Sequence, residues 1–275
     1  MTAPRWAPAL AAGMSSAAIT YGLTRLLSTA DSLARKNYRG DSISLAEGFA
    51  IATALTGCSL ARGDLAAAVA VGSAAVVGAA DDFDAGRHDG PAPAKGLRGH
   101  WKALQSGHVS TGVLKVLAIG SASALYAART RRVRNRTISD FMLDSVIIAG
   151  SANIANLFDL RPGRALKMSA MCASVANLVQ SNPRAYGAVM GSISGSAPTD
   201  LSARTMLGDM GANPLGLYVG MLATHPDSRA FRAVMALLTV GLIGAAEKVS
   251  FSTIIDQQPL LRALDRLGTQ RDGRE

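Results

Sequence analysis

Apolar blocks of about twenty residues, separated by short charged segments, constrain this chain more than any other feature. A block of that length crosses the hydrocarbon core of a bilayer as one helix, whereas a soluble core usually shows an alternating or amphipathic pattern. We place spans near residues 6–28, 45–60, 64–80, 108–128, 138–157, 165–181, 184–198, 213–224 and 229–248. The sequence therefore predicts an all-α, polytopic integral membrane bundle of about nine transmembrane helices, with a large soluble helical protein as the minor alternative.

The blocks are rich in Ala and Gly and poor in aromatic residues, which make up only 5% of the chain. Small residues let helices approach closely in lipid, where packing drives association, so this composition favours a tight bundle over separate anchors. The sixth to eighth spans are short and carry polar atoms, so we expect them to be broken, tilted or shielded by neighbours. We predict a single domain over residues 1–275, with a short polar cytoplasmic tail near 250–275.

The net charge of +9 comes from Lys and Arg in short loops without interleaved aromatic residues, which disfavours a nucleic-acid partner. With Met1 outside and Glu275 in the cytoplasm, the inner segments hold 16 basic residues and the outer side holds 10. The positive-inside rule therefore favours this orientation in a cell membrane. The cluster Arg129–Arg136 opposes it, and contact with anionic lipid headgroups is the one explanation that the sequence suggests for the cluster.

Three polar motifs fall on the cytoplasmic side in this orientation. "ADDFD" ends the third span and supplies Asp81 and Asp82, "NIANLFDLRPG" ends the fifth, and "LGDMGANPLG" joins the seventh to the eighth. Each motif alone has an ordinary explanation: a solvated helix end, a polar seam between helices, or a turn. Carboxylates near membrane depth are nevertheless costly and commonly functional, and three clusters on one face favour a shared site.

The residue types of these motifs suit Mg²⁺, which takes one or two protein carboxylates and fills its remaining positions with water and substrate phosphate oxygens. We expect Asp209 to lie in an exposed loop, where its flanking glycines would let backbone N–H groups approach a diphosphate. Lys95 and Arg98 of "KGLRGHWK" would screen phosphate charge, or would simply be a positive-inside loop. Lys115, inside the fourth span, would reach toward the site or extend to the membrane surface. The pattern predicts a membrane-embedded phosphoryl-transfer site.

These motifs, in this order, resemble those of the polyprenyl-phosphate N-acetylhexosamine-1-phosphate transferase family, over most of the chain from "RKNYRG" to "EKVSF". The family includes phospho-N-acetylmuramoyl-pentapeptide transferase and UDP-N-acetylglucosamine:undecaprenyl-phosphate transferase. The resemblance implies a Mg²⁺-dependent reaction in which polyprenyl phosphate attacks the β-phosphorus of a UDP-amino sugar. The products would be UMP and a lipid-linked precursor for cell-wall or other envelope glycan biogenesis.

The resemblance also implies roles for individual residues. Asp81 and Asp82 would orient or deprotonate the lipid phosphate, and Asp209 matches the magnesium-binding aspartate. Asn156 and Asp159 would hold the nucleotide diphosphate, with support from Asn153.

This chain departs from the family at several positions. "SLAEG" stands where a Pro and paired glycines are usual, Pro162 replaces a frequent Asp, and no His follows His225, so the family's His-containing loop is absent. An active transferase is therefore the first hypothesis. A catalytically silent membrane partner or scaffold in envelope assembly is the alternative, a transporter is a third, and a homodimer or an assembly partner is left open.

Overall fold

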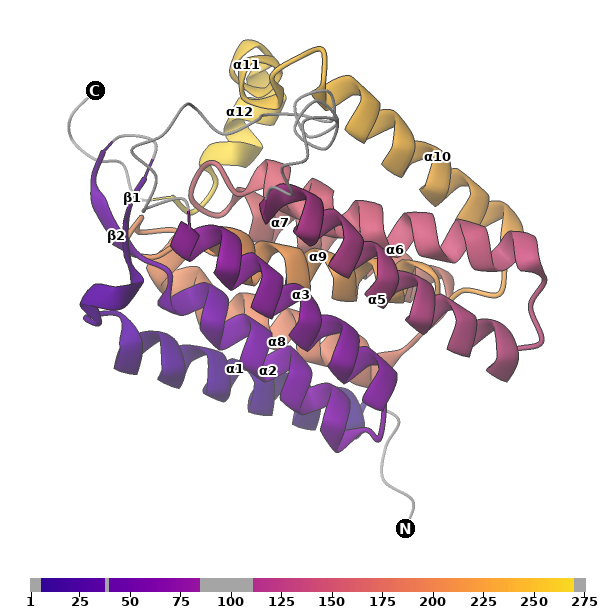
Figure 1. Ribbon diagram of the computed structural model, residues 1–275. Helices are drawn as coiled ribbons and strands as arrows, with labels where there is room; N and C mark the ends of the chain where they lie inside the picture. The colour runs from indigo at the N-terminus through magenta and orange to yellow at the C-terminus, as the bar shows by residue number, and fades with distance from the viewer. Residues whose placement is uncertain (1–5, 38–39, 85–110, 270–275) are drawn as a thin grey trace.

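The computed structural model describes residues 6–37, 40–84 and 111–269. It is a bundle of helices with one small hairpin, so the predicted all-α class is confirmed (Figure 1). The long helices are α1 (Ala7–Leu27), α2 (Ala46–Ala61), α3 (Leu65–Asp84), α5 (Thr111–Val133), α6 (Ile138–Phe158), α7 (Arg164–Val179), α8 (Pro183–Asp200), α9 (Gly208–Ala223) and α10 (Arg229–Ala246). The hairpin pairs β1 (Ala34–Lys36) with β2 (Ser42–Ser44), after a 3₁₀ turn at Asp31–Leu33, and the short helices α11 (Phe251–Gln257) and α12 (Pro259–Arg266) follow α10.

Each of the nine predicted spans corresponds to one of the nine long helices of the described ranges. By length and composition, three helical segments in these ranges could cross a membrane: Leu65–Phe83, Ile138–Phe158 and Arg229–Ala246. Helices α2, α7 and α9 have 16 residues each, or about 24 Å at ~1.5 Å per residue, which is shorter than a ~30 Å hydrocarbon core. The structure therefore supports membrane association through three apolar helices, and the figure of nine crossings stays a prediction.

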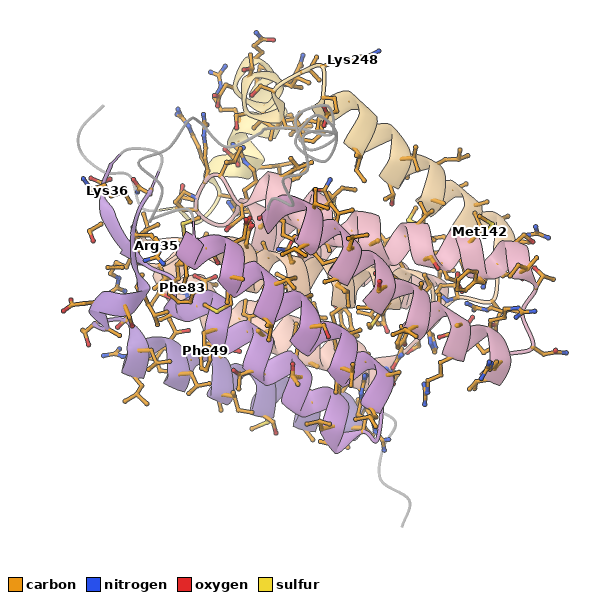
Figure 2. All side chains as sticks on the ribbon, in the orientation of Figure 1. Arg35, Lys36, Phe49, Phe83, Met142 and Lys248 are labelled. Atoms are coloured by element: carbon orange, nitrogen blue, oxygen red, sulfur yellow. The ribbon has the colours of Figure 1, made fainter. Side chains whose placement is uncertain are left out.

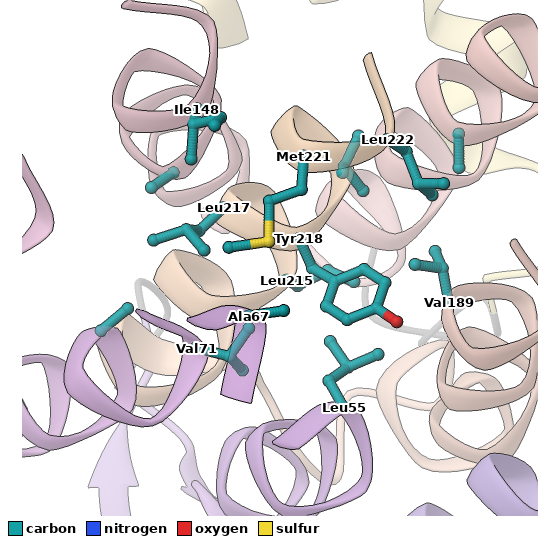
Figure 3. Packing of buried hydrophobic residues seen from close by; sticks show 14 of the residues in the cluster. Leu55, Ala67, Val71, Ile148, Val189, Leu215, Leu217, Tyr218, Met221 and Leu222 are labelled. Carbon is teal, nitrogen blue, oxygen red and sulfur yellow. The ribbon is translucent and has the colours of Figure 1, made fainter. Parts of the chain in front are cut away.

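Helix α9 is the central element of the bundle, and nearly all its residues are buried. Its neighbours are α2, α3, α6, α7 and α8. Leu215, Leu217 and Tyr218 fill the space between these helices (Figure 3). Glycines bring the backbones together: a Cβ at Gly78 of α3 would collide with the Asp209 carbonyl, and one at Gly48 of α2 with the Leu207 carbonyl.

Helices α1 and α8 run parallel and pack through small residues. Gly187, Gly191 and Gly195 of α8 face the carbonyl oxygens of Ala9, Gly13 and Ala17 of α1, in that order along both helices. The hydroxyl of Ser16 donates to the Ala188 carbonyl at 2.8 Å and lies 2.6 Å from the Ser192 hydroxyl. Spacing of small residues by four is a common device for close helix contact in lipid.

Large apolar side chains are exposed on the outer helices of the bundle. Examples are Leu26 on α1, Leu125 on α5, Leu178 on α7 and Leu237 on α10, which are 73%, 69%, 85% and 75% exposed. Ser16, Thr20, Ser192 and other small polar side chains are instead fully buried. An apolar exterior around a partly polar interior is typical of a helical bundle that meets lipid.

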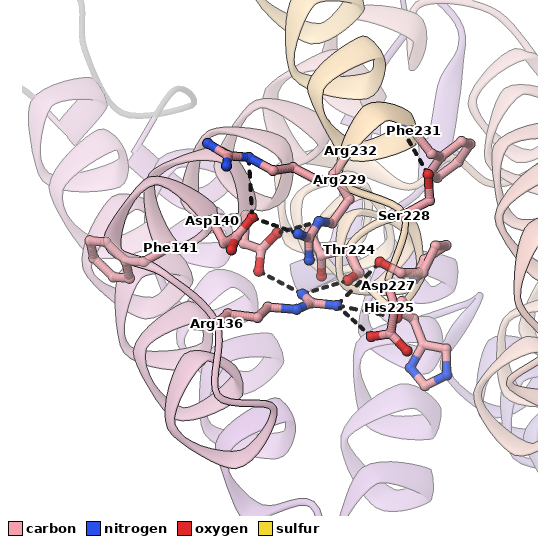
Figure 4. Close-up of polar contacts among 12 residues, drawn as sticks. Arg136, Asp140, Phe141, Thr224, His225, Asp227, Ser228, Arg229, Phe231 and Arg232 are labelled. Atoms are coloured by element: carbon pink, nitrogen blue, oxygen red, sulfur yellow. Dashed lines mark hydrogen bonds and ion pairs between the residues drawn. The ribbon is translucent and has the colours of Figure 1, made fainter.

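A buried network of charged groups connects α6, α10 and the loop between α9 and α10 (Figure 4). Arg136 bonds Asp144 and the Thr224 carbonyl at 2.8 and 2.9 Å, while Arg232, only 2% exposed, bonds Asp140 at 2.6 Å. Arg134 donates to Asp227 at 2.8 Å. Two arginines of the cluster Arg129–Arg136 are therefore explained by internal bonds, since buried cations need paired acceptors.

The segment predicted to be a short polar tail contains the two short helices α11 and α12 within its described residues. Arg161, after α6, forms a two-pronged ion pair with Asp256 of α11, with both N–O distances at 2.7 Å. Arg164 of α7 does the same with Asp265 of α12, at 2.7 and 2.8 Å. The mixture of Leu and charged residues in this segment folds as two short helices against the α6–α7 turn.

We expect Gly191→Ala to lower the thermal unfolding temperature, because its new methyl group meets the Gly13 backbone and overpacking typically costs about 1–3 kcal/mol. Gly120→Ala on α5 is the matched control, since its Cβ would meet no atom within 4 Å. Differential scanning fluorimetry in detergent measures both. Equal unfolding temperatures for the two variants would contradict the parallel packing of α1 on α8.

Candidate functional site

The polar motifs meet at one end of the bundle, where α3 and α6 end and α5 and α9 begin; we call it the carboxylate end. The Lys115 ammonium of α5 donates to Asp81 of α3 at 3.0 Å and also to Asp209 of α9. All three side chains are mostly covered, with exposed fractions of 17% for Lys115, 26% for Asp81 and 16% for Asp209. Carboxylates from two helices thus converge on a cation from a third, and Lys115 points inward.

Asp82 holds the first turn of α9. Its two carboxylate oxygens accept from the backbone N–H groups of Asp209, at 3.1 Å, and Met210, at 2.8 Å. An anion at a helix N-terminus satisfies donors that lack partners within the helix and lies at the positive end of the helix dipole. Asp82 therefore fixes where Asp209 lies relative to Asp81.

Arg35 of the hairpin closes over this junction. Its Nε donates to the Asp82 backbone carbonyl at 3.1 Å, and its guanidinium lies 5.0 Å from the centre of the Phe83 ring. Figure 2 shows Arg35 and Phe83 together beside the end of α3. We call Asp81, Asp82 and Asp209 the carboxylate cluster. The hairpin thus places the Arg35 cation at its rim.

Asp159 also binds the start of α9, from the end of α6. Its carboxylate, only 9% exposed, accepts from the Gly208 backbone N–H at 2.7 Å. The pKa of Asp159 lies well above its usual value, chiefly because its carboxyl group is buried. The nearby carboxylate of Asp200 raises this pKa further. The folded chain therefore favours the protonated form of Asp159.

Two predictions about "GDMG" are corrected. Asp209 lies in the first turn of α9, which begins at Gly208, and is not in an exposed loop. The N–H groups of Gly208, Asp209 and Met210 are bonded to Asp159 and Asp82, so they do not point freely toward a diphosphate. Gly208 is needed for its backbone φ of +59° and because a Cβ there would lie 2.9 Å from an oxygen of Asp82.

The other predicted residues lie farther from the cluster. Asn153 is exposed and Asn156 half-buried on the last turns of α6, and neither side chain makes a hydrogen bond within the described ranges. They share a helix with the residues that lead to Asp159 but are not tied to the carboxylate cluster. Lys95 and Arg98 lie outside the described residues.

Sequence reasoning missed two buried acids beside the site. Glu47 of α2 is fully buried and accepts from the Thr205 hydroxyl at 2.6 Å. Asp200, the last residue of α8, accepts from the Gly163 N–H at 3.0 Å. The signal for Glu47 was its position in an otherwise apolar helix, in the "SLAEG" stretch that departs from the family pattern.

A small cavity of about 110 Å³ opens beside Asp159 and Asp200. Lys36 and Asn37 of the hairpin and Arg161 of the α6–α7 turn also line it. The cavity therefore combines two acids with two cations, next to the carboxylate cluster. It has room for a small polar group.

Asp81 and Asp209 are two neighbouring carboxylates of the kind that bind Mg²⁺. Within the described part of the chain, no group of three or more His, Cys, Asp or Glu side chains is arranged to hold a metal ion. Asp81 and Asp209 nevertheless both bond one cation, the Lys115 ammonium, so their oxygens already converge as two hard ligands of a divalent ion would. Two carboxylates suffice for Mg²⁺ when substrate phosphate supplies other ligands, so the residues fit.

Comparison of the chain with protein-family models, with curated proteins and with solved structures finds no match in any of the three. Function is therefore inferred from the geometry of the carboxylate end.

We expect the stability of the wild type to fall relative to Asp159→Asn as the pH rises above about 4, the ordinary Asp value. The raised pKa means that the folded state binds the Asp159 proton more tightly than the unfolded state, so stability is lost as that proton leaves. Asn keeps an oxygen for the Gly208 N–H and does not titrate. Unfolding temperatures measured from pH 4 to pH 8 test this.

The control is Asp227→Asn at the opposite end. A hydrogen bond from Gln180 and nearby arginines lower the pKa of Asp227, so its small contribution is lost only below about pH 4, and the curve of Asp227→Asn should run parallel to that of the wild type from pH 4 to pH 8. If the curves of the wild type and Asp159→Asn run parallel over this range, the shift assigned to Asp159 is wrong.

Proposed function

We propose that this protein transfers a sugar-1-phosphate from a UDP-amino sugar to polyprenyl phosphate in a cell membrane. The observation that carries the proposal is the convergence of Asp81, Asp209 and Lys115 beside the N-terminus of α9. Phosphoryl transfer needs positioned charge more than covalent chemistry, and this cluster supplies two anionic ligands and one cation.

The roles divide according to which carboxylates bind the first N–H groups of α9 and which bind Lys115. Asp209 and Asp81 would hold Mg²⁺, which when bound supplies positive charge opposite the diphosphate. Asp81 is the more exposed of the two and would accept a proton from, or orient, the lipid phosphate. The oxygen of that phosphate forms a bond to the sugar-bearing phosphorus, and the bond from this phosphorus to UMP breaks.

Asp82 and Asp159 act differently in this proposal. Their oxygens bond the first N–H groups of α9, so they would position Asp209. Lys115 would leave its bridging position when the metal binds and pair with substrate phosphate. Asn153 and Asn156 would contact the nucleotide diphosphate, and Lys95 and Arg98 would screen its charge.

A catalytically silent scaffold is the competing proposal. The same contact favours it, because the Lys115 ammonium already lies between Asp81 and Asp209 and neutralises one of their two negative charges. A chain without activity could keep Lys115 permanently in the position that Mg²⁺ would take in an active one. The two proposals therefore differ in whether Mg²⁺ displaces this internal cation.

We expect Asp209→Asn to reduce transfer by at least ~100-fold, because it removes charge from one preorganised electrostatic contact while preserving size. Transfer is measured with purified protein, Mg²⁺, undecaprenyl or decaprenyl phosphate and a panel of radiolabelled UDP-sugars. Mg²⁺ and UDP-sugar together should raise the unfolding temperature of the wild type and leave the Asn variant nearly unchanged. Asp41→Asn, the same change at an exposed position in the hairpin turn, is the control and should keep full activity.

Absence of transfer, together with absence of a Mg²⁺-dependent shift for every sugar in the panel, would favour the scaffold. Transfer that survives in Asp209→Asn would contradict the role given to that residue.

The proposed multi-pass topology places the carboxylate end in the cytoplasm with cytosolic UDP-sugars, and the N-terminus outside. In a variant with Cys58 and Cys172 replaced by Ala, we expect Arg131→Cys to react with a membrane-impermeant maleimide in intact cells. Leu160→Cys should react only after permeabilisation, because α6 lies between the two positions. Both side chains are exposed, so burial would not explain a difference. Labelling of both in intact cells would overturn the topology.

A further inference from the structure

A second polar cavity, of about 510 Å³, lies at the end of the bundle opposite the carboxylate end. Its lining comes from four places in the chain: the start of α1, the turn between α2 and α3, the last turns of α5 and the start of α8. The lining residues are Pro8, Arg62, Gly63, Asp64, Arg129, Asn182, Pro183 and Arg184. In Figure 1 the α2–α3 turn is at the lower right, beside the start of α1.

The lining carries three arginines and one acid. Asp64 lies 3.8 Å from Arg62 and 3.4 Å from Arg129, both longer than the ~2.7–2.9 Å of a strong charged hydrogen bond. One of its oxygens also accepts from the Ala67 N–H at the start of α3. Arg184 makes no ion pair or side-chain hydrogen bond within the residues that the structure describes. The cavity therefore keeps an excess of positive charge with guanidinium donors to spare.

Arg62 is the best-fixed of the three cations. Its side chain is 17% exposed and its guanidinium lies 5.6 Å from the centre of the buried Tyr218 ring. Its Nε is buried and has no hydrogen-bond partner within the described residues. Because its nearest acid, Asp64, lies 3.8 Å away, this cation is held against the core but only weakly paired, and it can bind an anion from the cavity.

The backbone adds to the same charge. Helices α1 and α8 run parallel, so both N-termini lie at this end, and Pro8 and Pro183 in their first turns line the cavity. Each helix N-terminus carries a partial positive charge that attracts phosphate-like anions. The parallel glycine packing thus brings two positive helix ends together with the three arginines.

We propose that this cavity binds a phosphate group, either on the headgroup of an anionic lipid or as a free phosphate ion. Arginine recognises phosphate through paired N–H donors, and this open, solvent-facing cavity is wide enough for a phosphate group. The apolar side chains of Leu10 on α1 and Leu125 on α5 are exposed within about one turn of lining residues, so acyl chains can lie along the bundle while a headgroup enters the cavity. The inference does not depend on the chemistry of the carboxylate end.

The test is binding to the purified full chain in detergent, followed by thermal unfolding. The probes are inorganic phosphate, dioctanoyl phosphatidylglycerol and, as a zwitterionic comparison, dioctanoyl phosphatidylcholine. We expect a saturable rise in unfolding temperature with phosphatidylglycerol, with inorganic phosphate, or with both, and little effect of phosphatidylcholine. A rise with the lipid alone assigns the headgroup, whereas an equal rise with inorganic phosphate assigns the free ion.

Arg129→Gln combined with Arg184→Gln should weaken the apparent affinity by about 10-fold or more, since two charged contacts are lost. Both side chains are exposed, so folding should be unaffected. The control is Arg131→Gln combined with Arg132→Gln, two exposed arginines of α5 that do not line the cavity. Equal loss in the control pair, or no saturable rise in the wild type with either phosphate probe, would overturn the proposal.

Discussion

The N-terminus of α9 is the point on which the arrangement of the carboxylate end depends. A helix that starts inside a bundle has backbone N–H groups that water cannot reach, and each needs an acceptor. Asp82 from α3 and Asp159 from the end of α6 supply these acceptors, and in doing so they join three helices at one place. The position of Asp209 relative to Asp81 and Lys115 follows from that junction.

Close packing makes this junction possible. Gly48 of α2 and Gly78 of α3 let the backbone of α9 approach, and Gly216 and Gly220 of α9 itself do the same for α6. The Gly208 backbone turns in the left-handed region, where a side chain would be strained. Small residues therefore have two effects in this chain. They favour helix association through close packing, and they leave room for carboxylates between helices.

The sequence was sufficient to predict the helices but not their partners. All nine predicted segments correspond to helices, because apolar length and charged ends are local signals. The meeting of Asp81, Lys115 and Asp209 could be anticipated from three motifs on one face. The hairpin that carries Arg35 could not, since β1 and β2 have three residues each and no distinctive pattern. The bonds from Asp82 and Asp159 to the start of α9 could not be predicted either. They depend on where that helix begins, and the sequence placed this boundary five residues too late.

The parallel pairing of α1 with α8 has a consequence for how the chain is made. The hydroxyl of Ser16 bonds residues 172 and 176 positions further along the chain. At a synthesis rate of about 5–20 residues per second, α1 emerges on the order of 10 s before its partner exists. Throughout that interval its small polar face lacks the helix that it packs against in the folded chain. The first helix therefore reaches its final packing only after residues up to α8 have been made.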